Sequence, residues 1–240
     1  MKELILCIFI VAMIPLFAVE VLTEDFESGN IPDSWTQEYL TGEINWSVNA
    51  GGQNDHPASA HSGDFNAWFF DNSTDGNTTR LISPVFALTT HSKLNFCYAL
   101  DDWVNYQDYL RVYYRTAATE EWVLLQSFEE PMMEWEEVSI DLPEPSPTYS
   151  ICFEGEANWG YGACIDDIVV EDCVMSMLVW NNDNNSHYLD PQTGAYTNCE
   201  LSITQSLDAL GACYELLSFL PTDLEEYDII FIELGLYCVG

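Results

Sequence analysis

The sequence has 240 residues, and five Lys and Arg against forty Asp and Glu give it a formal net charge of −35. Nucleic acids and anionic bilayers are bound through basic surfaces, and the last cation of this chain is Arg115, so both partners are excluded. Charged residues are still only 19% of the chain, against 48% apolar and 14% aromatic residues, which is typical of a folded protein and not of a disordered acidic tail. A folded protein with this charge has an acidic surface, which metal ions, salt or a basic partner must screen. Divalent cations are the first candidates.

The amino terminus has the pattern of an export signal. Met1 and Lys2 precede an apolar run, residues 4–19, that is shorter than the roughly 20 residues of a membrane span. We therefore predict a signal peptide over residues 1–19 and a secreted, extracellular or cell-surface protein; the alternative is an anchor that stays uncleaved. In an oxidising compartment we expect some of the remaining cysteines to form disulfides, although spacing does not give their pairing.

Between residues 20 and 174, short runs of alternating apolar and polar residues are separated by Gly, Pro, Asn and Asp clusters. In the segment 93–100, for example, Leu94, Phe96, Tyr98 and Leu100 alternate with Lys93, Asn95, Cys97 and Ala99. A period of two with many aromatic and β-branched residues predicts strands, and many strands without a helical period predict a sandwich or barrel. We predict an all-β domain here.

The pattern changes after Cys173. An apolar run at 177–180 is followed by a polar loop, an amphipathic helix and two further strands at 214–217 and 228–234. The helix is predicted from Leu201, Thr204, Leu207 and Leu210, with Gly211 as its cap. This order predicts an α/β unit with a parallel sheet. Because so short a segment cannot cover both faces of that sheet, we expect residues 175–240 to be an incomplete domain, cut off at Gly240.

Three pieces in order along the β region carry a resemblance to a known family. They are the opening Glu24-Asp25-Phe26-Glu27, the Ser83-Pro84 before a strand, and the closing Ile165-Asp166-Asp167-Ile168. Residues 22–172 thereby resemble the MAM-like jelly-roll modules of secreted bacterial proteins, including the cleaved-adhesin and choice-of-anchor families found beside exported peptidases. The resemblance implies an antiparallel two-sheet jelly-roll sandwich outside the cell that serves as a binding or anchoring module and is usually not catalytic. The truncated α/β segment follows this sandwich.

The second domain resembles the beginning of a flavodoxin- or amidotransferase-like α/β domain. Such domains usually carry acids after the first strand, where this chain has Asn181 and Asn182. That departure puts an inherited metal or ligand role in doubt.

Acids at the first and last strands of the β region are the candidate metal ligands. A carboxylate between apolar residues such as Ile165 and Ile168 is costly to leave unpaired, and calcium suits sets of carboxylate and carbonyl oxygens. The resemblance agrees, since many jelly rolls of this kind hold such an ion between first and last strands. The candidates are Glu27 and Asp167 first, then Glu24, Asp25, Asp64 and Asp71. The alternative is that these acids line a solvated edge.

Aromatic residues next to acids are the candidate ligand site. Trp103, Tyr106 and Tyr109 lie close to Asp102, a mixture common where sugar rings stack and hydroxyls bind carboxylates. The alternative is that these rings pack in the core or at its rim.

The chain has no HExxH, GxSxG or Walker-type glycine motif, so we expect no enzyme activity. The predicted function is a calcium-stabilised extracellular binding or adhesion module for a glycan or protein. The alternative is an accessory, non-catalytic part of a secreted multidomain hydrolase, in the first instance a peptidase, whose catalytic domain lies outside this chain.

Overall fold

The computed structural model describes residues 18–89, 92–173, 175–182, 187–189, 194, 196–210, 212–225 and 227–233. The predicted signal peptide, apart from Ala18 and Val19, lies outside these residues, as do Gly211 and the chain end at Gly240.

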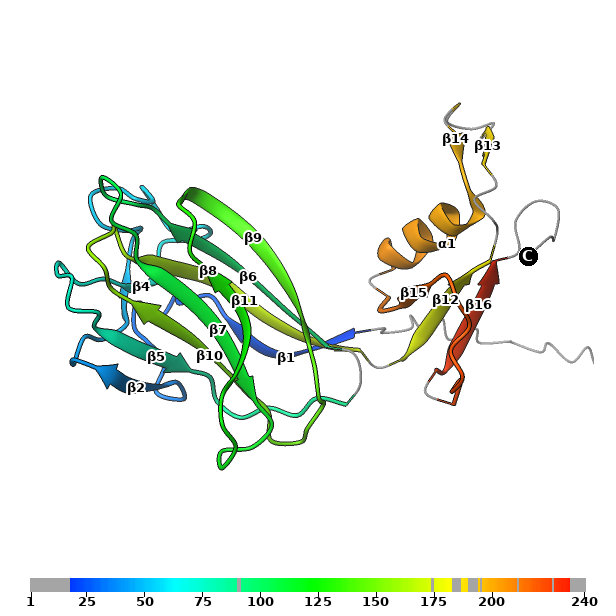
Figure 1. The fold of residues 1–240 in the computed structure, drawn as a ribbon, viewed down its shortest axis with the longest axis horizontal. Coiled ribbons are helices and arrows are strands. Elements are labelled where there is room, and N and C mark those ends of the chain that lie inside the picture. Colours follow the sequence, from blue (N-terminus) through cyan, green and yellow to red (C-terminus); the bar gives the residue numbers. More distant parts are fainter. Residues whose placement is uncertain are drawn as a thin grey trace, which may run out of the picture.

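Two antiparallel sheets make up most of the described chain (Figure 1). The first has the order β3-β4-β11-β6-β9, and β1 also pairs with β11. Its strands are β1 Ala18–Glu24, β3 Ser47–Asn49, β4 Asn66–Phe69, β6 Ser92–Leu100, β9 Met132–Leu142 and β11 Ala163–Cys173. Two strands share β11 because β4 pairs with residues 163–165 and β1 with residues 168–173. The first and last strands of the predicted domain therefore lie side by side.

The second sheet has the order β2-β5-β10-β7-β8, and every pairing in it is antiparallel. Its strands are β2 Thr36–Thr41, β5 Thr78–Ile82, β7 Tyr109–Arg115, β8 Val123–Phe128 and β10 Ser150–Glu156. Leu110, Val112 and Tyr114 of β7 are buried, while the residues between them are half-exposed, as the period of two requires. The predicted antiparallel two-sheet sandwich is confirmed.

Large side chains from both sheets and their connections form one core. The largest fully buried ones are Trp46, Tyr149, Phe26, Phe69, Phe96 and Phe153. Each buried side chain of this size contributes about 1.5–3 kcal/mol relative to an exposed position. Phe26 enters the core from left-handed backbone, with a φ of 55°, between two acids that stay outside.

The predicted α/β unit follows the sandwich. Strands β12 Met177–Asn181, β15 Glu215–Leu217 and β16 Ile229–Glu233 form a parallel sheet in the order β15-β12-β16. Strands β13 Tyr188–Leu189 and β14 Tyr196–Thr197 pair separately, and a disulfide joins Cys173 to Cys213. A second small core contains Met177, Val179 and Leu207.

The predicted helix is α1, Cys199–Asp208. The side chain of Asn198 caps its first turn by accepting a hydrogen bond from the Leu201 amide at 2.7 Å. The helix ends at Asp208 with Ala209 as its C-cap, before the predicted glycine. Leu207 packs in the small core, but Leu210 is exposed because it follows the last turn.

Candidate functional site

Three aromatic rings meet at one end of the sandwich. Trp103, Tyr106 and Trp159 have ring centroids 5.5–6.3 Å apart and are 37–41% exposed. We call these three residues the aromatic cluster. Fully packed rings would be buried, so Trp103 and Tyr106 are not core residues, and the alternative that they pack at the rim stays open.

A tight turn holds two of the rings together. Trp103 and Tyr106 each donate a backbone hydrogen bond to the other's carbonyl, at 2.9 Å. Val104 and Asn105 between them both have positive φ, of 52° and 73°, as a primed hairpin turn requires. The Asp102 carboxylate accepts from the Asn105 amide at 2.9 Å. Asp102, predicted as a sugar ligand, therefore also stabilises this turn.

A buried carboxylate holds the loop that carries the third ring, Trp159. Asp108 is 1% exposed and accepts backbone hydrogen bonds from Asn158, Gly160 and Gly162, at 2.5, 3.0 and 2.7 Å. Burial raises the pKa of Asp108, although the three hydrogen bonds oppose the shift. Gly160 must be glycine, because a Cβ there would lie 2.7 Å from an oxygen of this carboxylate. Asp108 thus fixes the loop that carries Trp159.

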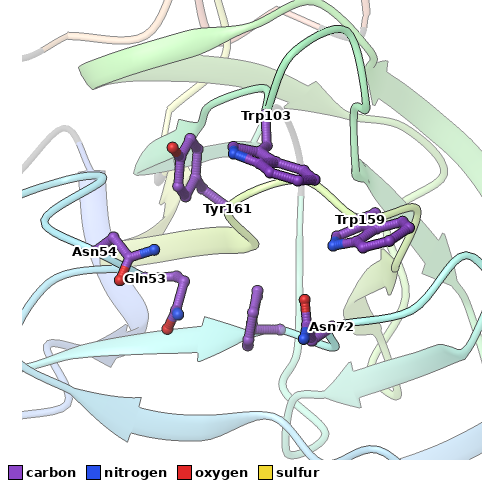
Figure 2. A pocket seen from close by; sticks show the side chains of 8 residues that line it. Gln53, Asn54, Asn72, Trp103, Trp159 and Tyr161 are labelled. Atoms are coloured by element: carbon purple, nitrogen blue, oxygen red, sulfur yellow. The ribbon is translucent and has the colours of Figure 1, made fainter.

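A pocket of about 420 Å³ opens beside the aromatic cluster (Figure 2). Its lining residues, all uncharged, are Gln53, Asn54, Phe70, Asn72, Trp103, Trp159, Gly160 and Tyr161. In Figure 2 the amide side chains of Gln53, Asn54 and Asn72 lie across the pocket from Trp103. Amides both donate and accept hydrogen bonds, so this lining offers flat apolar faces and polar groups together.

His56 supports one wall of the pocket. Its ring stacks on Tyr161 at 3.9 Å between centroids, and its Nδ1 lies 2.6 Å from an Asp101 oxygen. The Tyr161 amide donates to the Asp101 carbonyl at 3.2 Å. These contacts fix the orientation of the Tyr161 ring.

Only some residues of this site were predictable from the sequence. Trp103 and Tyr106 were predicted, whereas Trp159, Tyr161 and the amides were missed. The run Asn158-Trp159-Gly160-Tyr161-Gly162, in which two aromatics alternate with two glycines, was the available signal. Tyr109 lies elsewhere: it is half-buried in β7, beside the Arg111 guanidinium at 5.4 Å.

The two first-choice metal ligands both contact the loop 61–65. The exposed Glu27 carboxylate accepts backbone hydrogen bonds from Asp64 and Phe65 at 2.8–3.0 Å. Asp167 accepts from the Ser62 hydroxyl at 2.7 Å, and its second oxygen lies 2.6 Å from His61 Nδ1. The first and last strands are thus linked through one loop.

A neighbouring acid, which was not among the predicted ligands, is more deeply buried. Asp166 is fully buried and accepts from the amides of His61, Ser62 and Asp167 at 2.8–3.3 Å. Burial raises its pKa to about 6, although these amide hydrogen bonds oppose the shift. The sequence could not tell Asp166 from Asp167, because alternation assigns them to opposite faces without saying which face is covered.

Of the remaining candidates, Glu24 and Asp25 line a cavity of about 290 Å³ together with Asp167, whereas Glu27, Asp64 and Asp71 do not line it. Glu24 and Asp25 accept hydrogen bonds from the backbone amides two residues on, at 2.9 and 3.1 Å. Burial raises the pKa of Glu24. Asp64 contributes its amide to Glu27, and Asp71 bonds within its own loop to Ser73 and Asn77. The described residues contain one group of three or more His, Cys, Asp or Glu donors within 4.8 Å, and it is His61, Cys97 and Asp167.

Three further cysteines are free and buried, Cys97, Cys152 and Cys164. Burial, and then the charges of Asp167 and Glu137, raise the pKa of Cys97 to about 11.

Within the described ranges, no helix has both the length and the apolar character needed to cross a bilayer.

Comparison with known proteins gives a family and a fold. The family model of the MAM domain (meprin/A5/mu) matches residues 25–174. No curated protein matches the sequence. The K3 cleaved adhesin domain of Lys-gingipain (Kgp) from Porphyromonas gingivalis W83 is 20% identical, with a TM-score of 0.51 over 65% of this chain and 99% of that domain. The K1 cleaved adhesin domain of the same protein is 18% identical, with a TM-score of 0.51 over 63% of this chain and 98% of the domain. The predicted resemblance of the β region to MAM-like, cleaved-adhesin modules is confirmed.

Proposed function

The chain belongs to the MAM domain family, and from this premise we propose that residues 25–174 form a secreted, non-catalytic binding module for a neutral glycan. The observation that carries the proposal is the aromatic cluster beside the amide-lined pocket. Sugar rings present flat C–H faces that stack on exposed aromatics, and their hydroxyls pair with amide side chains. The neighbours' identity as adhesin domains agrees with a binding role.

The charge of the protein supports a neutral ligand over an acidic one. The chain has a net charge of −35, and the eight pocket-lining residues include neither Lys nor Arg. A sulfated or uronic-acid glycan would meet a negative field without a cation to pair with. The disulfide between Cys173 and Cys213 supports export, since such bonds persist in oxidising compartments.

A glycan array probed with the full chain, followed by calorimetry with the best neutral oligosaccharide, tests this function. Trp103→Ala and Trp159→Ala should each weaken binding by about 10-fold or more, which corresponds to ~1.4 kcal/mol. Tyr39→Ala, which removes an exposed ring on β2, is the matched control. If no glycan binds and a protein partner binds through the same rings, the ligand class in this proposal is wrong.

We also propose that calcium binds at Glu27, with Asp25 and Asp64 as further oxygen ligands. These three acids are exposed and offer only oxygen donors, which suits a hard cation. Asp167 suits calcium less well, because an imidazole and a thiol lie beside it. Thermal unfolding in calcium and in chelator tests this: wild type should melt higher in calcium, and Glu27→Gln should remove the difference. An unchanged difference in Glu27→Gln would argue against this site.

A further inference from the structure

Three side chains with metal-binding donors meet on the face of the first sheet that points away from the core. They are His61 from the loop before β4, Cys97 from β6 and Asp167 from β11, with one donor atom of each within 4.8 Å of the others. We propose that this group is a binding site for Zn²⁺. It shares no residue with the glycan pocket and does not depend on the proposed function.

A bulge in β11 brings these residues together. The pairing of β11 with β6 shifts between Asp166 and Val169, and Asp167 has left-handed backbone with a φ of 49°. Such a bulge redirects a side chain out of the regular ladder. The Ser62 hydroxyl and His61 then fix both oxygens of Asp167. Trp135 packs edge-on against the His61 imidazole at 5.9 Å between centroids and limits its rotation.

The donor set selects the metal. Zn²⁺ is bound in proteins by thiolate, imidazole and carboxylate, which are the three donors present here, whereas calcium takes oxygen alone. A cavity of about 360 Å³ lies over the group, and Glu137 lines it with all three residues. Glu137 pairs directly with Cys97 across β6 and β9, so its carboxylate is the candidate fourth ligand. The Glu137 oxygens are not part of the group of donors within 4.8 Å, so this side chain must turn towards the ion to complete a tetrahedral Cys-His-Asp-Glu set.

A small movement is enough to open the His61–Asp167 pair to the ion. His61 Nδ1 and the Asp167 oxygen are 2.6 Å apart, in contact with each other. Two zinc bonds of ~2.0 Å at the tetrahedral angle would put such a nitrogen and oxygen about 3.3 Å apart. The imidazole must therefore withdraw by less than ~1 Å. The His61 side chain is 41% exposed, so a shift of this size does not require the core to repack. Cys97 is only 4% exposed, so the protein shields its thiol almost completely from solvent.

Calorimetry with Zn²⁺ and absorbance with Co²⁺, both on the full chain with its thiols verified as reduced, test the site. We expect one Zn²⁺ per chain and a thiolate-to-cobalt charge-transfer band. Cys97→Ser should abolish the band, and His61→Ala and Asp167→Asn should each weaken zinc binding by about 10–100-fold. His61→Ala is the safer variant for folding because this side chain is on the surface.

Two control variants separate binding at this group from binding at another buried thiol or at the exposed acids. Cys164→Ser removes another buried free thiol and should leave zinc binding unchanged. Glu27→Gln should lower the response to calcium and leave the response to zinc unchanged. Absence of zinc binding, absence of the cobalt band, or an equal loss in Cys164→Ser would each overturn the proposal.

Discussion

The buried carboxylate of Asp108 offers the sharpest prediction about how the glycan pocket is built. In Asp108→Ala, the amides of Asn158, Gly160 and Gly162 lose their acceptor, and the last two of these bonds are buried. An unsatisfied buried donor costs about 1–3 kcal/mol, which gives roughly 2–6 kcal/mol for two. Part of this cost is offset, because water can reach the Asn158 amide and because the variant no longer buries a carboxylate charge. We expect a net loss of about 3 kcal/mol in the free energy of unfolding.

The change is measurable in three ways. For a domain of this size, 1 kcal/mol shifts the melting temperature by roughly 2–4 °C, so Asp108→Ala should melt about 6–12 °C lower. Amide hydrogen exchange at Gly160 and Gly162 should accelerate, and binding of the array-selected glycan should weaken with the loss of a fixed Trp159. Asp33→Ala removes an exposed acid and is the matched control. A shift below about 2 °C with unchanged exchange would refute the role assigned to Asp108.

Three further predictions concern charge and cross-links in the described residues. Glu154 is 4% exposed and accepts hydrogen bonds from two arginines and a tyrosine. Glu154→Gln should therefore lower the free energy of unfolding, measured with denaturant, by about 2–3 kcal/mol, and a loss below ~0.5 kcal/mol would contradict a stabilising role of this network. Cys213→Ser opens a bond between residues 40 apart and should cost about 4 kcal/mol in the unit that follows the sandwich, read from its own melting transition. The pKa of Asp108 is raised in the fold, so its contribution to stability is lost as pH rises through that pKa. As the pH rises above the ordinary carboxyl pKa, the melting temperature of wild type should therefore fall relative to that of Asp108→Asn, and parallel profiles would contradict this sign.

The strands were predictable because alternation is a local property. Leu94, Phe96 and Leu100 are all buried, as their period of two indicates. Their neighbours Cys97 and Ala99 were expected on the polar face but are buried too, at 4% and 1% exposed. β6 lies between β11 and β9 in its sheet, and side chains such as those lining the cavity over Cys97 cover its outer face.

The candidate sites were predictable only where their residues are close in sequence. Trp103 and Tyr106 are three residues apart, and one turn brings them together. Trp159 joins them through contacts such as those of Asp108, across 50 or more residues, which no local pattern contains. The same holds for His61 and Asp167, which are 106 residues apart and meet at a bulge. The sequence therefore predicted acids near the first and last strands, but not their imidazole and thiol neighbours.

The central claim is that this module binds its ligand through the aromatic cluster, and glycan binding by the Trp103→Ala/Trp159→Ala double variant tests it most directly. Both rings are more than a third exposed, so the double variant should keep the wild-type melting temperature within a few degrees. We predict that it loses measurable binding to every glycan that wild type binds on the array. Wild-type affinity in a folded double variant would contradict the account.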